Sequence, residues 1–408
     1  MSTDPYLIIT LKEETTRGTG TTRGGTRGGT RGFSPSSSTR SITSIETANL
    51  NPREATSAAN ERNQLVLPDL SIRLVPPFPA NGSNGGVSTA DASDNTWGIE
   101  ATGVANSRFD GSGVKVAVLD TGIVEHPAFD GLNILKKDFT DEGIEDLDGH
   151  GTHCAGTIAG QRILGQPRFG VAPNIDQLLV AKVIPSDGGG SSLALVQAIQ
   201  WAMQNGADII SMSLGFDLPG AVEGMIADGW PADLAASRAL QTYQANVEAF
   251  AALANAGFAM AGVGAGSLIV AAAGNESKRE INDDYVIGVA PPAAAPGVLS
   301  VGAIGSTGSS STNFTVAPFS NTSPNLSAPG VDILSAWIGG GMESISGTSM
   351  ATPHVAGIAA LWMQQLREQI GIVTPDTIKN MLMGRARNDV FQGGWSAVDV
   401  GLGLAIAP

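Results

Sequence analysis

Apolar runs of about five residues recur along most of the chain, and each is followed by small and polar residues. Runs of this kind are typical of strands buried on both faces of a parallel sheet. Ala-rich stretches of helical length, Ala194–Asn205 and Ala351–Leu366, alternate with them. The predicted strands are Val114–Leu119, Leu178–Val183, Asp208–Met212, Leu268–Ala273 and Val298–Ala303. The alternation predicts an α/β domain with a mainly parallel sheet flanked by helices on both faces.

The first 95 residues follow a different pattern, with short elements separated by long polar stretches. Tyr6–Leu11 is apolar and β-branched, which predicts a strand. Asn51 is followed by a proline and then by Glu54, the pattern of a capping box, so a helix is expected over residues 52–62. The extended stretch Leu65–Leu74 comes next and ends before two consecutive prolines. These elements predict a small α+β unit.

Two stretches of low complexity interrupt this N-terminal unit. Residues 15–40 hold Thr-Arg-Gly-Gly repeats with almost no apolar side chain to offset the entropy of ordering, so we expect them to be disordered. A tether for RNA and a plain flexible loop are the two interpretations of this tract. Residues 80–95, rich in Gly, Ser and Asn, predict a linker. The boundary therefore divides an N-terminal segment, 1–95, from a domain of residues 96–408.

Charge and composition exclude several classes of protein. Acidic residues outnumber basic ones 38 to 23, and residues 1–95 carry nine of each sign, so the net charge of −15 falls in residues 96–408. Such a surface disfavours a nucleic-acid partner. A single cysteine excludes a disulfide framework, and no apolar run reaches the ~20 residues of a membrane helix. Without a cationic and then apolar leader we expect a cytoplasmic location, with export by a non-Sec route as the alternative.

Four polar side chains lie where α/β domains carry catalytic groups, near strand ends and helix starts. Asp120 ends one apolar strand, and Asn275 follows another. His150 and Ser349 come directly before helical stretches. Each residue alone has a plain structural alternative, such as a strand-end acceptor or an N-cap. Together they hold the groups of nucleophilic catalysis, in which a histidine takes the proton of a serine and a carboxylate orients that histidine.

The four histidines allow one further alternative. His150 and His153 are three residues apart, which raises the possibility of a metal site. No glutamate base of the metalloprotease type lies between them, so a catalytic base with a structural neighbour is the favoured interpretation. We expect His126 to be packed or solvent-facing and His354 to be structural. No metal ligand set is assigned.

The order Asp, His, Asn, Ser and the motifs around these residues resemble the subtilisin-like serine proteases, the subtilases. The resemblance covers residues 97–407, about three quarters of the chain. Cys154 follows the second histidine, as it does in the branch that resembles proteinase K. Further matching motifs are Lys182–Gly190, Asp208–Gly215, Phe319-Ser320-Asn321 and Ala328-Pro329-Gly330.

The resemblance implies a subtilisin-like fold and a serine endopeptidase that hydrolyses polypeptide substrates through an acyl-enzyme. Ser349 is then the nucleophile, His150 the general base and Asp120 its orienter. Asn275 donates a hydrogen bond to the oxyanion. The substrate-binding residues that it implies are Gly188, Gly189, Gly190, Ser213, Leu214, Gly215, Ala273 and Gly274. The rival is a catalytically silent peptide-binding protein or scaffold, against which the presence of all four polar groups argues.

The resemblance implies no cofactor for the chemistry and leaves structural calcium open. The acidic stretch of residues 141–148 offers hard oxygen ligands for Ca²⁺, although a run of acids is more often a solvated loop. The insert of residues 216–268 is either a lid over the site or a longer surface helix. Cys154 is expected to be an inert small apolar residue.

The N-terminal segment resembles a pro-region of the family in outline, apart from the Arg/Gly tract. It is then an inhibitor of its own enzyme, with residues 65–78 lying in the active-site groove by strand addition. We expect cleavage between Leu74 and Asn95, where the linker is accessible. A flexible leader with no role is the alternative.

Overall fold

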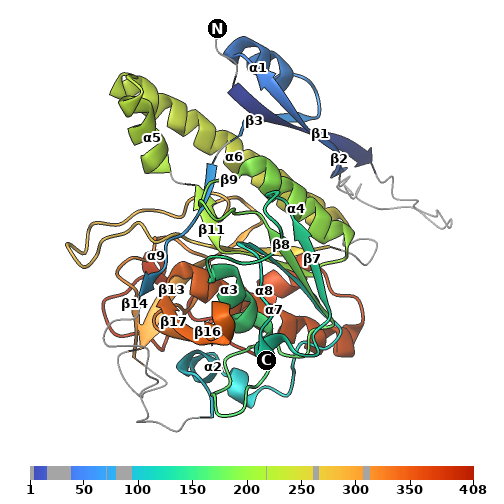
Figure 1. Ribbon diagram of the computed structural model, residues 1–408, viewed down its shortest axis with the longest axis vertical. Coiled ribbons are helices and arrows are strands. Elements are labelled where there is room, and N and C mark those ends of the chain that lie inside the picture. The colour runs from blue at the N-terminus through green and yellow to red at the C-terminus, as the bar shows by residue number, and fades with distance from the viewer. Residues whose placement is uncertain are drawn as a thin grey trace, which may run out of the picture.

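The computed structural model describes residues 4–15, 38–69, 71–79, 94–216, 218–260, 266–306 and 313–408 (Figure 1). In this part of the chain the central sheet has eight strands in the order β14-β13-β12-β10-β6-β8-β7, with β15 also paired to β13. Every pair is parallel except β13 with β14. The strands are β6 (Lys115–Asp120), β7 (Ile134–Asp138), β8 (Gln177–Lys182), β10 (Ile209–Met212), β12 (Leu268–Ala272), β13 (Leu299–Ser306), β14 (Phe314–Val316) and β15 (Leu326–Pro329).

The central sheet is buried on both faces, because successive side chains of a strand point to opposite sides. In β6, Val116 and Val118 belong to the apolar cluster that includes α3 and α7, whereas Ala117 and Leu119 belong to the cluster that includes α4 and α6. The predicted α/β architecture with helices on both faces is therefore confirmed. The helices are α3 (His150–Ala159), α4 (Ser192–Gln204), α6 (Ala232–Met260) and α7 (Thr348–Ile370).

The strands and helices predicted for residues 96–408 all occur, with ends shifted by a few residues. The shift that matters is at α7, which begins at Thr348 and so takes Ser349 into its first turn. Among the described residues, no helix is both long and apolar enough to cross a bilayer. The other elements of this part are α2 (Trp97–Ala101), η1 (Val104–Asn106), η2 (Pro127–Phe129), α5 (Leu218–Ala227), β16 (Ile333–Ala336), η4 (Ile338–Gly340), β17 (Met342–Ser346), α8 (Pro375–Arg385) and α9 (Ala397–Val400).

The N-terminal segment folds into a three-stranded antiparallel sheet with one helix. The strand order is β2-β1-β3, and the helix α1 carries the predicted capping box. Asn51 accepts from the backbone N–H of Glu54, whose side chain accepts from the N–H of Asn51 in return. The helix ends at Ala59, three residues before the predicted end. The elements are β1 (Asp4–Thr15), β2 (Ser38–Leu50), α1 (Pro52–Ala59) and β3 (Gln64–Pro68).

Strand β2, which precedes Asn51, was not predicted from the sequence. It pairs with β1 along its length. Sequence reasoning missed the strand because Ser and Thr dominate it, and its Ile42 and Ile45 become partly buried only against the neighbouring elements. Of the tract predicted to be disordered, residues 16–37 lie outside the described residues, as do residues 80–93 of the predicted linker.

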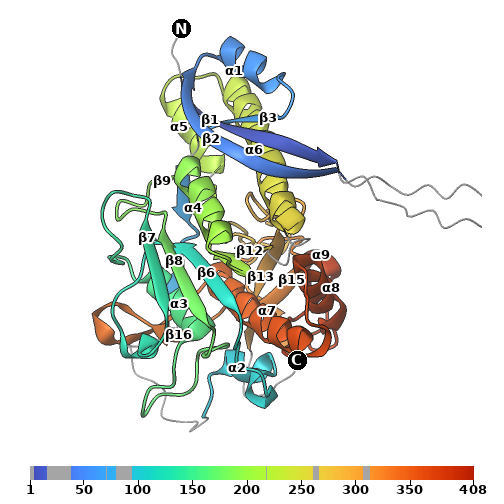
Figure 2. The same cartoon turned by 90° about the vertical axis from the view of Figure 1, so that its right-hand side faces the viewer.

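The insert is a helical hairpin, α5 and α6, that supports the N-terminal sheet. In both views α4 and α6 lie between that sheet and the central sheet (Figures 1 and 2). Leu7 and Ile9 of β1 share one apolar cluster with Phe250 of α6. Arg238 of α6 donates a hydrogen bond to the hydroxyl of Tyr6 at 2.8 Å. The insert is the long helix of the second alternative, but the N-terminal sheet rather than solvent covers α6.

The stretch predicted as one extended segment, Leu65–Leu74, is divided between two sheets. β3 stays in the N-terminal sheet, while residues 71–79, which we name the strap, cross to the other domain. The first part of the strap lies antiparallel between β9 and β11, and its last residues pair with β17. The elements are β4 (Ser71–Leu74), β5 (Phe78–Pro79), β9 (Gly190–Ser191) and β11 (Leu214–Phe216).

Candidate active site

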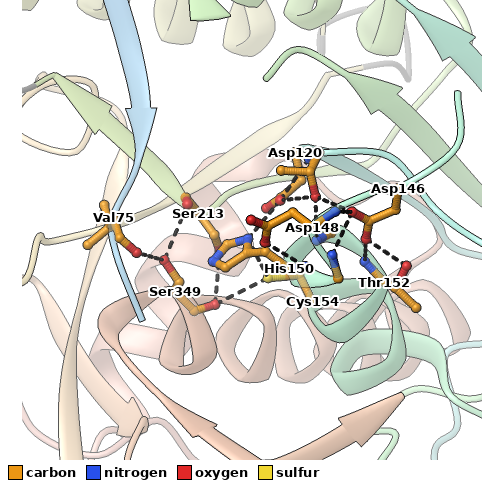
Figure 3. Close-up of polar contacts among 12 residues, drawn as sticks. Val75, Asp120, Asp146, Asp148, His150, Thr152, Cys154, Ser213 and Ser349 are labelled. Carbon is orange, nitrogen blue, oxygen red and sulfur yellow. Dashed lines mark hydrogen bonds and ion pairs between the residues drawn. The ribbon is translucent and has the colours of Figure 1, made fainter. Parts of the chain in front are cut away.

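Asp120 and His150 form a fully buried pair where β6 ends and α3 begins (Figure 3). Nδ1 of the ring lies 2.7 Å from Oδ1 of the carboxylate. An ionised carboxylate only accepts, so Nδ1 carries the proton and Nε2 of the neutral ring is left as an acceptor. The chain can place the ring here because the preceding Gly149 has φ +105° and a Cβ at that position would lie 2.7 Å from the Trp337 ring.

A buried carboxylate, Asp146, fixes the loops that carry this pair. Its Oδ1 accepts from Thr121 Oγ1 at 2.9 Å and from the Gly149 N–H at 2.8 Å. Its Oδ2 accepts from the N–H and the hydroxyl of Thr152 at 2.8 and 2.7 Å. Thr121 follows Asp120 and Gly149 precedes His150, so Asp146 joins the two backbones. This residue lay in the acidic stretch that the sequence left unassigned.

The pair raises the basicity of the histidine. Burial of the His150 ring opposes its charged form, but the charge of Asp120 and the hydrogen bond to it outweigh burial and hold the pKa of His150 well above 6.5. Without such a partner, burial lowers the pKa of His153 to about 3 and that of His354 to about 4. His150 is therefore the strong base among these three buried imidazoles.

Ser349 lies beside this ring but does not bond to it. Its Oγ is 3.2 Å from the carbonyl oxygen of Ser213 and 3.5 Å from that of Val75, the two acceptors of its hydrogen (Figure 3). Among the described residues, Nε2 of His150 has no hydrogen-bond partner. The hydroxyl therefore donates to backbone carbonyls rather than to His150.

Asn275 follows β12, and its side chain contacts the strap one residue after the carbonyl that lies at Ser349. Its Oδ1 accepts from the N–H and the hydroxyl of Thr348, both at 2.9 Å, and this fixes the orientation of the amide. Its Nδ2 then points into the site and donates to the carbonyl oxygen of Pro76 at 3.0 Å. The amide therefore presents a fixed donor to a peptide carbonyl beside the serine, which is the geometry of an oxyanion hole.

Two backbone segments hold the strap as neighbouring strands would. Leu214 and Gly215 pair with the strap from one side, directly after Ser213. Gly190 pairs with Ile72 from the other side, and a Cβ on Gly190 would lie 2.6 Å from the Ile72 side chain. Only glycine therefore leaves room for this side chain.

The other expected substrate-binding residues lie nearby without pairing in these ladders. Gly188 and Gly189 form the turn before β9, where their N–H groups donate to Pro185 and Asp187. Ala273 and Gly274 connect β12 to Asn275, and the Gly274 N–H donates to Thr348 Oγ1.

The histidines do not form a metal site with one another. Nε2 of His153 bonds to the Ile333 carbonyl at 2.9 Å rather than converging with His150. His354 Nδ1 bonds within its own helix, to the Met350 carbonyl at 2.8 Å. His126 is buried and caps η2, so it is packed rather than solvent-facing.

Within the described residues, one group of three potential metal ligands occurs, Asp120, His150 and Cys154, with ligand atoms within 4.8 Å of one another. Two of them are the buried pair already described. Burial raises the pKa of the Cys154 thiol, which keeps it protonated, whereas a metal ligand must be a thiolate. The thiol instead donates to the Ser349 carbonyl at 3.5 Å.

Two carboxylates of the acidic stretch are held by donors of the protein itself. Both oxygens of Asp146 accept from protein groups. Glu142 accepts from the N–H and hydroxyl of Ser186 and pairs with the buried Lys182 at 3.4 Å. No calcium ligand set is assigned in this stretch.

Residues 111–401 match the model of the subtilase family, peptidase S8. The chain belongs to the subtilase family. The predicted resemblance is thereby confirmed. Catalysis by subtilases needs no cofactor.

Individual relatives of this subtilase are proteases. This subtilase is 37% identical to the thermostable alkaline protease of Halalkalibacterium halodurans over 65% of this chain and 62% of that protein. It is also 37% identical to subtilisin-like protease 2 of Pseudogymnoascus destructans over 65% of this chain and 57% of that protein. The match thus spans less than two thirds of the length of either relative.

The fold of this subtilase is similar to the crystal structure of a cold adapted subtilisin-like serine proteinase. The TM-score is 0.53 and the identity 29%, over 78% of this chain and 99% of that one. The predicted subtilisin-like fold is confirmed. The sequence did not predict the register of the strap, which brings Val75 to Ser349 and Pro76 to Asn275. The two consecutive prolines after an extended stretch were the available signal for where the strap meets the site.

Proposed function

We propose that this subtilase is a serine endopeptidase whose peptidase unit, residues 96–408, is held latent by its N-terminal segment, residues 1–95. The observation that supports the activity is the convergence of four side chains from distant parts of the chain. The buried Asp120–His150 pair lies beside Ser349 (Figure 3), and the Ser349 hydroxyl and the Asn275 amide contact consecutive carbonyls of the strap. Such a set serves acyl transfer to a serine.

The chemistry follows from these positions. Ser349 Oγ attacks the carbonyl carbon of a bound peptide while Nε2 of His150 takes its proton, and Asp120 stabilises the imidazolium that forms. The Asn275 amide and the backbone N–H of Ser349 donate to the oxyanion. His150 then gives its proton to the leaving amine, and an acyl-enzyme remains. Water, activated by His150, releases the carboxylic acid and regenerates the serine.

The substrate in this proposal is an extended polypeptide. β9 and β11 leave space for one strand between them, and backbone pairing there is independent of side chains. In the latent chain the strap fills that space, and the N-terminal sheet is held on α6. Processing between Leu74 and Asn95 would free the groove.

Covalent labelling tests the activity. Fluorophosphonate should label the wild-type chain once it has processed itself, and the same material should hydrolyse casein. Ser349→Ala should lose both without unfolding, because the hydroxyl contributes chemistry rather than core volume. Ser344→Ala on β17 is the matched control and should retain both.

Casein hydrolysis that persists in Ser349→Ala would contradict the assignment. A wild-type chain that binds extended peptides but is never labelled would instead identify a catalytically silent peptide-binding protein.

A further inference from the structure

The strap crosses the active site with two consecutive carbonyl groups at the catalytic side chains. The Val75 carbonyl oxygen lies 3.5 Å from Ser349 Oγ. The next carbonyl oxygen, that of Pro76, accepts from Asn275 Nδ2 at 3.0 Å. Figure 3 shows the strap in blue passing Ser349, with the Val75 carbonyl directed at its hydroxyl. One of these two carbonyl carbons is the one that a nucleophile at this place would attack.

The strap is anchored on both sides of this point. Before it, Ile72 is fully buried against Gly190, and Val75 is also buried. After it, the ring of Phe78 stacks on that of Phe319, with centroids 4.7 Å apart and an angle of 19° between the planes. The bond at the nucleophile is therefore held by contacts upstream and downstream, as a bound substrate would be.

Each of the two carbonyl carbons is joined by its peptide bond to the nitrogen of a proline. They are the Val75–Pro76 and Pro76–Pro77 bonds. Whichever of the two carbonyl carbons Ser349 attacked, the leaving group would be a proline nitrogen. That nitrogen carries the ring carbon Cδ where other residues carry hydrogen.

A proline nitrogen is a poor leaving group in this geometry. To break the C–N bond, His150 must deliver a proton to the nitrogen, and the nitrogen must turn its lone pair toward Nε2. The ring holds Cδ and Cα on that nitrogen and fixes φ near −65°, so it cannot reorient freely. Cδ also adds bulk beside the carbonyl carbon that Ser349 must approach.

We propose that the strap is an inhibitor that the enzyme binds but does not cut, because both bonds presented to the nucleophile are bonds to proline. This inference rests on the proposed function and narrows it. Of the bonds between Leu74 and Asn95, the two at Pro76 and Pro77 are excluded as processing sites. The latent chain is released by a cut elsewhere or by displacement of the strap.

The nucleophile is not bonded to its base while the strap is bound. The Ser213 carbonyl accepts from the Ser349 hydroxyl at 3.2 Å, while Nε2 of His150 has no partner among the described residues. The bound strap thus coexists with a serine hydroxyl that donates to backbone carbonyls rather than to its base.

The test replaces the prolines in the full-length chain. Intact-mass and N-terminal sequencing should show no cut between residues 75 and 77 in the wild type over hours at neutral pH. The variant Pro76→Ala/Pro77→Ala should be cut there, at a rate independent of protein concentration because the strap is bound in cis. Adding Ser349→Ala to that variant should abolish the cut. Pro79→Ala, which removes a proline of the strap away from the nucleophile, should stay uncut at residues 75–77.

The outcomes separate this inference from the proposed function. A wild-type chain cut after Val75 or Pro76 overturns the inference and leaves the peptidase standing. The inference is overturned in the same way if the double variant reacts with fluorophosphonate yet remains uncut. If the folded double variant stays uncut and unlabelled while the processed wild type is labelled, the inference is overturned. If neither chain is ever labelled or hydrolyses casein, the proposed function itself fails.

Discussion

His150 and Asn275 carry different parts of the proposed reaction, and each leaves its own kinetic signature. The histidine sets how the rate depends on pH, because only its neutral form accepts a proton. The asparagine sets the height of the barrier, because its donor matters most when charge develops on the oxygen. Both residues are held by partners that contact no substrate, Asp120 and Thr348.

The raised pKa of His150 predicts that the loss of activity on the acidic side of the pH profile begins at a higher pH than for an ordinary histidine. Below its pKa the ring is protonated and cannot take the proton of Ser349, so kcat/KM should rise with pH through a midpoint above 6.5. The Asp120 carboxylate that raises this pKa is not part of the strap, so the buried pair persists when the strap leaves. A pH profile of peptide hydrolysis by the processed enzyme measures it. A midpoint at or below 6.5 would contradict the prediction.

Replacing the amide of Asn275 should slow the chemical step. Asn275→Ala removes the Nδ2 donor and should lower kcat by ~10²–10³ with little change in KM, as for single oxyanion donors. Steady-state kinetics on a peptide substrate measure the two constants. Since Asn275 also accepts from Thr348, thermal unfolding should be recorded in parallel. A change confined to KM would make Asn275 a contact of the ground state.

At the scale of elements, the strap is a strand that must bind tightly enough to keep the groove closed. Ile72 supplies the most buried side chain of β4, packed against Gly190. This side chain belongs to the same apolar cluster as residues of β1 and α6, so the strap and the N-terminal sheet stabilise one another.

Truncating that side chain should release activity. Ile72→Ala leaves a cavity, and core truncations of this size cost ~2–5 kcal/mol. Part of this lost free energy weakens the binding of the strap in the groove. The full-length variant should therefore hydrolyse casein faster than the wild type. Ile281→Ala, at an exposed isoleucine, is the control and should change nothing. Equal rates for the variant and the wild type would mean that the strap does not limit access.

At the scale of the whole molecule, the proposed latent state joins two units through contacts that the described residues make at several places. The N-terminal sheet packs on α6, β4 completes a sheet with β9 and β11, and β5 pairs with β17. All of these contacts are made by residues 4–15 and 38–79. The Arg/Gly tract, residues 16–37, lies outside the described residues.

Removing that tract should leave latency intact. Thr15 and Ser38 are paired at the end of the β1–β2 ladder, so a short Gly-containing turn can replace residues 16–37 and close a hairpin. The shortened chain should show the same rate of casein hydrolysis and the same processing as the full chain. Premature activity would show that the tract takes part in inhibition. Salt-dependent RNA binding lost on the same deletion would favour the alternative of an RNA tether.

The local features of this protein could be predicted from the amino-acid sequence. The capping box at Asn51, the buried strands and the Ala-rich helices follow from short-range rules, and the structure contains them with shifted ends. Asp120, His150, Asn275 and Ser349 could be named because their neighbours along the chain form specific motifs. Strand β2 was missed because its few apolar residues are buried only by partners distant in sequence.

How these parts meet could be learned only from the folded chain. The direction of the Ser349 hydroxyl, the role of Asp146 between two loops, and the passage of Val75 and Pro76 past the nucleophile depend on residues far apart in the chain. Register is set by packing along the whole strap, and a shift of one residue would present a different bond. Local patterns carry no such information, because the energy that fixes the register comes from contacts that exist only after folding.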